Sequence, residues 1–112
     1  MQKDDAIRLR HMLNAAREAR SFTQNKTRGS LDKSRQLELA LVKSIEIIGE
    51  AATRITDECR KELSQIPWAN IIGMRNRLIH AYFDINRDIL WKTVTDDLPP
   101  LITELQKILE SK

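Results

Sequence analysis

The sequence predicts an all-α protein, a four- to five-helix up-and-down bundle, and three observations support this. Only 3 Gly and 3 Pro occur among the 112 residues, too few for the many turns of a β-sandwich or barrel. Apolar residues recur at spacings of three and four in several segments, which is the period of an amphipathic helix, and no segment alternates like a strand. The length is that of one domain, so we expect a single helical domain over residues 1–112.

The predicted helices follow from this spacing and from the residues that interrupt it. The first covers about residues 4–24, and residues 25–30 form a loop with Gly29 as its breaker. The longest helix, about 32–55, is apolar on more than one face, which is typical of a central helix or of one that contacts a second subunit. Its small residues Gly49, Ala51 and Ala52 would let a neighbouring helix approach closely.

The second half of the chain predicts three more helical segments. A short piece at 58–63 precedes a helix at 68–82, whose first turn suits Pro67. A last helical region covers about 87–109, and Pro99 with Pro100 must kink it or split it in two.

The composition excludes several classes of protein. One Cys excludes an internal disulfide, and one Cys with 2 His excludes a Cys/His zinc cage. No apolar run approaches the roughly 20 residues that span a bilayer, and the first residues lack the apolar region of a secretory signal. We therefore expect a cytoplasmic protein with no membrane partner.

Charge is distributed unevenly along the chain. Residues 1–35 carry nine basic and four acidic side chains, whereas the rest carries ten basic and twelve acidic ones, so that the net charge is +3. Such asymmetry is typical of a protein that binds an anionic partner such as a nucleic acid, although helical surfaces are charged in any case. Arg17 and Arg20, beside the apolar stripe of the first helix, are candidate contacts for that partner.

The helix predicted at 68–82 carries the residues that are the best candidates for catalysis or ligand binding. Arg75 lies in the centre of its apolar face, with five bulky side chains within about 60° of it on a helical wheel. A buried guanidinium is costly unless it is paired, so Arg75 must meet a carboxylate, a second subunit or an anionic ligand in a cleft. Asp84 is one candidate carboxylate for Arg75 or Arg77.

Three further polar residues share the end of this helix. Asn76 and His80 are four residues apart and lie on one flank, and Tyr82 is nearly eclipsed with Arg75. A histidine transfers protons near neutral pH, and an arginine can bind two oxygens of one phosphate at once. This set of side chains therefore suits phosphodiester cleavage without a metal or other cofactor. The alternative is an Arg–carboxylate bridge beside a structural histidine and tyrosine.

Residues 75–82 fit the pattern R-x4-H-x-Y, and in this the chain resembles the HepT-like toxins of the HEPN superfamily. The surrounding sequence is similar to that family over nearly the whole chain, at Glu50-Ala51-Ala52, Ile66-Pro67-Trp68, 71–76, 82–85, 89–91 and 97–99. The resemblance implies an all-helical homodimer that pairs through the motif face, with both motifs at one cleft.

The resemblance also implies an activity and a partner. The protein would be a metal-independent endoribonuclease and the toxin of a two-gene toxin–antitoxin module, with RNA as substrate. Arg75 would hold the scissile phosphate, Asn76 would orient His80 or contact phosphate, and His80 would activate the 2′-hydroxyl. Tyr82 would accept AMP from an MntA-type nucleotidyltransferase antitoxin. Arg77 is either a surface charge or an RNA contact.

Two other functions stay open. In the first, the chain is a non-catalytic helical dimer that acts mainly as binding partner and AMPylation substrate of that nucleotidyltransferase. In the second, it is a helical dimer without chemistry, in which Arg75 is paired across the subunit interface.

Overall fold

The computed structural model describes residues 1–80 and 84–110, without the side chains of residues 79 and 80. The described residues form seven α-helices, one π-helix and no strand, so the all-α prediction is confirmed. Four helices are long: α1 (Lys3–Phe22), α3 (Arg35–Thr53), α5 (Trp68–His80) and α7 (Leu98–Glu110). The shorter elements are α2 (Arg28–Lys33), α4 (Asp57–Glu62), α6 (Arg87–Lys92) and the π-helix η1 (Thr93–Asp97).

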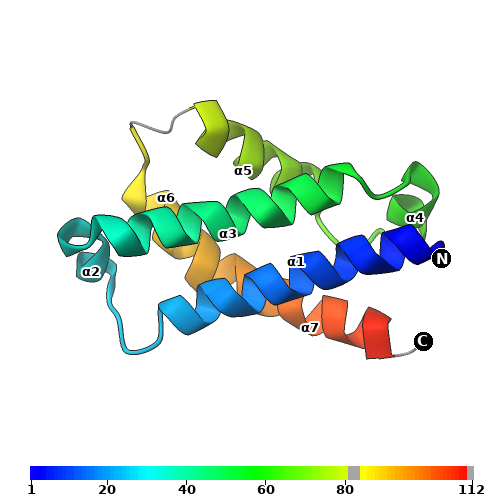
Figure 1. The fold of residues 1–112 in the computed structure, drawn as a ribbon, viewed down its shortest axis with the longest axis horizontal. Helices are drawn as coiled ribbons and strands as arrows, with labels where there is room; N and C mark the ends of the chain where they lie inside the picture. The colour runs from blue at the N-terminus through cyan, green and yellow to red at the C-terminus, as the bar shows by residue number, and fades with distance from the viewer. Residues whose placement is uncertain (81–83, 111–112) are drawn as a thin grey trace.

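Helices α1 and α3 form the centre of the bundle, where they run side by side in opposite directions (Figure 1). Helix α7 packs on α1, and α5 packs on the other side of α3. The core lies between α1, α3 and the C-terminal helices, where Leu9, Met12, Leu41, Val94 and Leu105 are fully buried. None of the described helices is long and apolar enough to cross a membrane.

The connection between α1 and α3 differs from the expected loop. Gly29 lies inside α2, so its prediction as a loop breaker is wrong. The left-handed backbone conformation falls instead on Asn25, with a φ of 60°, a conformation that Asn tolerates better than most residues. The long helix predicted from residue 32 begins at Arg35, because Ser34 is extended and its side chain caps α3 by accepting from Leu37 N–H.

The C-terminal helical region is continuous from α6 through η1 to α7. Pro99 and Pro100 lie in the first turn of α7, where proline is tolerated. The irregularity precedes them: Leu98 N–H donates to the Thr93 carbonyl, five residues back, which is the wide turn of a π-helix. The predicted interruption of the helical region thus takes the form of a widened turn, and it lies just before the prolines rather than at them.

A buried carboxylate on α3 forms an ion pair with α6. Glu38 is only 2% exposed and accepts from Arg87 Nε and from Arg35 Nη1, each at 3.1 Å. Arg28 adds a bridge from α2, with its Nε 2.6 Å from Asp88 on α6. These ion pairs fix the start of α6, which follows the segment after α5.

Helices α3 and α5 approach each other closely at Gly49. A Cβ added to Gly49 would fall inside the contact distance of Arg75 Cβ and Cγ, and 3.5 Å from the Ile71 carbonyl oxygen. The expected role of a small residue in admitting a neighbouring helix is thus confirmed at Gly49, and the helix it admits carries Arg75.

We predict opposite effects for two Gly→Ala substitutions. Gly49→Ala should lower the free energy of unfolding by about 1–3 kcal/mol, because the added methyl group pushes α5 away from α3. Gly73→Ala should raise it by up to about 1 kcal/mol, because nothing lies within 4 Å of the added Cβ and alanine favours helix. Urea denaturation of both variants measures this, and equal effects would contradict the close approach.

Candidate active site

Arg75 is held by two side chains of its own chain. Its Nη2 donates to Glu50 Oε2 at 2.6 Å, and its Nη1 donates to Asn76 Oδ1 at 2.9 Å. The Arg75 side chain is 26% exposed, so the guanidinium lies at the surface end of the contact with Gly49. Of the partners expected for Arg75, the structure supplies a carboxylate, and within the described residues that carboxylate is Glu50 rather than Asp84.

Glu50 lies between two guanidinium groups. Besides Arg75 it binds Arg54, whose Nη2 is 3.3 Å from Oε1. The hydrogen bond from Arg75 is the main cause that lowers the pKa of Glu50 below its usual value of 4.5, and Arg54 adds to it. Glu50 is therefore ionised at neutral pH, and it fixes one edge of the Arg75 guanidinium. Because a guanidinium has five N–H donors, others remain for a ligand.

A pocket of about 380 Å³ opens beside this ion pair, and we call it the Arg75 pocket. Residues from α1, α3 and α5 line it: Arg8, His11, Lys43, Glu46, Ile47, Glu50, Ala51, Arg54 and Arg75. Four of these side chains are cationic and two are anionic, so the pocket favours an anionic ligand.

The structure places the predicted catalytic residues on one helix. Arg75 and Asn76 are in contact, and His80 is the last residue of α5. The side chain of His80 and all of Tyr82 lie outside the described residues. Asn76 is exposed, and its oxygen faces Arg75.

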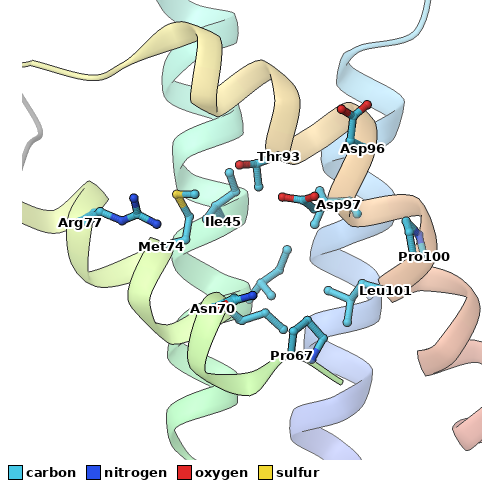
Figure 2. A pocket seen from close by; sticks show the side chains of 13 residues that line it. Ile45, Pro67, Asn70, Met74, Arg77, Thr93, Asp96, Asp97, Pro100 and Leu101 are labelled. Atoms are coloured by element: carbon cyan, nitrogen blue, oxygen red, sulfur yellow. The ribbon is translucent and has the colours of Figure 1, made fainter. Parts of the chain in front are cut away.

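The residues predicted to bind RNA do not line the Arg75 pocket. Arg17 is exposed on α1, and Arg20 donates from Nη1 to the Val94 carbonyl at 3.4 Å. Arg77 borders a second pocket of about 550 Å³ between α5, η1 and α7. Figure 2 shows Arg77 and Asp97 pointing into this space from opposite walls, with Ile45 of α3 behind them.

Sequence reasoning missed the contribution of α1 and α3 to the pocket. His11 was not among the residues that the sequence singled out, yet it lines the same pocket as Arg75. A signal was present, because Lys43, Glu46, Ile47, Glu50 and Arg54 are spaced by three and four and form one mostly charged face of α3.

Within residues 1–78 and 84–110, no three or more His, Cys, Asp or Glu side chains are grouped so that they could hold a metal ion.

We predict that Glu50 titrates below 4.5 and that Arg75→Ala moves its pKa back toward that value. Because the folded-state pKa is lowered, the Glu50–Arg75 pair is intact above the usual pKa and is lost as the pH falls through the lowered one. Carboxyl-carbon NMR measures the titration. Arg54→Ala is the control and should raise the Glu50 pKa less, since Arg54 contributes less than Arg75. A larger rise in the Arg54 variant would contradict the geometry.

Comparison with known proteins places the chain in a family. The family described as "Ribonuclease HepT-like" matches residues 12–108, which include Arg75, His80 and Tyr82. No solved structure matches the chain.

Three relatives illustrate the range of similarity. A Methanocaldococcus jannaschii protein named "Gamma-glutamylcyclotransferase and putative RNase" is 36% identical over 98% of this chain, which spans only 50% of that protein. A second M. jannaschii protein, named "Putative RNase", is 31% identical over 94% of this chain and 96% of its own length. "Probable ribonuclease HepT" of Thermococcus cleftensis is 38% identical over 66% of this chain and 67% of its own length. Since the family match covers most of the described bundle and the whole motif, the chain belongs to the ribonuclease HepT-like family.

Proposed function

We propose that the protein is a metal-independent endoribonuclease, the toxin component of a two-gene toxin–antitoxin module. One observation carries the proposal: the family match runs through the R-x4-H-x-Y segment, and the arginine of that segment borders a cationic pocket. The names of two relatives, "Putative RNase" and "Probable ribonuclease HepT", support the same substrate class.

In the proposed reaction, Arg75 binds non-bridging oxygens of the scissile phosphate through the N–H groups that Glu50 and Asn76 leave unused. His80 removes the proton of the adjacent 2′-hydroxyl. The 2′-oxygen forms a bond to phosphorus, and the bond from phosphorus to the 5′-oxygen breaks. The 5′-oxygen leaves as a hydroxyl group that takes its proton from water, and the other product ends in a 2′,3′-cyclic phosphate.

Glu50 and Asn76 position Arg75 in this proposal. A free carboxylate beside a phosphate would repel it, but Glu50 is paired with both Arg75 and Arg54. The pairing offsets its charge and holds the guanidinium plane in one orientation, so that less conformational entropy is lost when phosphate binds.

We also propose that two subunits pair through the motif face and that Tyr82 is the regulatory site. Ile47 lines the Arg75 pocket and is 40% exposed, which supports a contact with a second subunit there. An MntA-type nucleotidyltransferase would transfer AMP to Tyr82, two residues beyond His80. The added phosphate would compete with substrate for Arg75 by charge and would block the site by volume.

One observation favours the alternative, a non-catalytic dimer that is mainly a binding partner and AMPylation substrate of the nucleotidyltransferase. Arg75 is already paired with Glu50 and Asn76 inside one chain, as a structural arginine would be. The same pairing speaks against the need for a partner across the subunit interface, because Arg75 is satisfied without one.

We predict that AMP-free protein cleaves single-stranded RNA in the presence of EDTA and leaves 2′,3′-cyclic phosphate ends. Arg75→Ala and His80→Ala should each lower the rate by about 100-fold or more, because they remove phosphate binding and proton transfer. Gel analysis of labelled RNA with mass spectrometry of the ends measures this, after intact mass has shown that no AMP is bound.

Two controls separate the candidate functions. Arg10→Ala removes an exposed guanidinium that lines none of the described pockets, and it should leave the rate within about twofold. Tyr82→Phe should keep cleavage but lose AMP acceptance. Cleavage that persists in both Arg75→Ala and His80→Ala would refute the roles assigned to these residues. AMP transfer to Tyr82 without any cleavage by the wild type would favour the alternative.

A further inference from the structure

The Arg75 pocket holds more cationic side chains than the phosphate contact at Arg75 requires. Arg8 and Lys43 line it together with His11, and none of these three side chains has a hydrogen-bond or ion-pair partner within the described part of the chain. Arg75 and Arg54, by contrast, are both engaged with Glu50. Three unpaired donors therefore converge on one concave surface that also carries the candidate catalytic arginine.

These donors come from two helices, and they extend the cationic surface from Arg75 across α1 and α3. Arg8 and His11 are three residues apart on α1, so they lie on one face. Lys43 on α3 and Arg54, the C-cap residue of that helix, are eleven residues apart, which corresponds to about 16 Å along a helix. A surface of that length accommodates more than one phosphate of an extended strand.

We propose that Arg8, His11 and Lys43 form a phosphate-binding track that leads single-stranded RNA across α1 and α3 to Arg75. The inference rests on the proposed function, since it takes RNA as the ligand of the same site. Arg8 and Lys43 contribute positive charge, and His11 donates a hydrogen bond from its ring N–H.

The contacts of the track are to the RNA backbone rather than to bases. Among the residues that the structure describes, those that line the Arg75 pocket include no Phe, Tyr or Trp, so none of them offers an aromatic platform for base stacking. Binding along the track should therefore be independent of base sequence and strongly dependent on salt.

The test measures binding separately from cleavage. A fluorescent single-stranded oligonucleotide with 2′-O-methyl groups has no nucleophilic hydroxyl, so its affinity for the full chain is read by anisotropy at several salt concentrations. Each lost phosphate contact lowers the salt slope by about 0.7. Arg8→Ala/Lys43→Ala should thus lower the slope by about 1.4 and weaken binding about 25-fold at 0.1 M salt.

Two double variants serve as matched controls. Arg10→Ala/Lys33→Ala removes the same net charge from exposed positions that line no described pocket, and it should change the affinity by less than about threefold. Arg8→Lys/Lys43→Arg keeps both charges and should keep most of the affinity. Thermal unfolding verifies that every variant is folded. If Arg8→Ala/Lys43→Ala is unstable, Lys43→Ala alone, at an exposed position, provides the test.

The outcomes separate this inference from the proposed function. Equal weakening in both charge-removing variants would overturn the track, because it would reflect only the overall field of the protein. A wild-type protein that binds and cleaves RNA, with Arg8→Ala/Lys43→Ala unchanged, would overturn the track alone. A wild-type protein that binds no RNA would overturn both. If Arg8→Ala/Lys43→Ala keeps its affinity for RNA but loses affinity for polyglutamate, the surface would bind an acidic protein segment instead, and the track would be overturned.

Discussion

The contact between Gly49 and Arg75 determines the geometry of the candidate site. Because residue 49 has no Cβ, α5 lies directly against α3, and the guanidinium of Arg75 reaches the carboxylate of the next residue, Glu50. Both partners are partly exposed, at 26% and 45% of their side chains, so solvent screens their attraction. The pair therefore contributes more to the orientation of Arg75 than to the stability of the bundle.

Helix α5 separates two surfaces of different character. Arg75 and Arg77 are about 200° apart on the helix, so one borders the cationic pocket and the other borders the pocket near η1 and α7. Around Arg77, the carboxylates of Asp96 and Asp97 outnumber the single guanidinium. The charges around Arg75 therefore suit a phosphate better than those around Arg77, which supports the Arg75 side as the entry for the proposed RNA substrate.

The long helices were predictable from the sequence because their periodicity is a local property. The breaks were harder to predict, since they depend on competition between neighbouring signals. Gly29 favours a break in isolation, but α2 begins there because Thr27 and Ser30 form a capping box, and Asn25 takes the left-handed conformation instead. The widened turn of η1 before Pro99 likewise depends on a backbone hydrogen bond, from Leu98 N–H to the Thr93 carbonyl, which the spacing of apolar residues does not reveal.

The site was predictable only as far as its own helix. The sequence indicated that Arg75 needs a partner, because a guanidinium in an apolar face is costly. It did not identify Glu50, which lies 25 residues earlier and meets Arg75 only through the register of two antiparallel helices. That register depends on Gly49, and the same packing brings α1, with Arg8 and His11, to the pocket. A charged stripe beside a small residue on a central helix is thus a long-range signal: the small residue marks where a neighbour approaches, and the stripe supplies the groups that the neighbour meets.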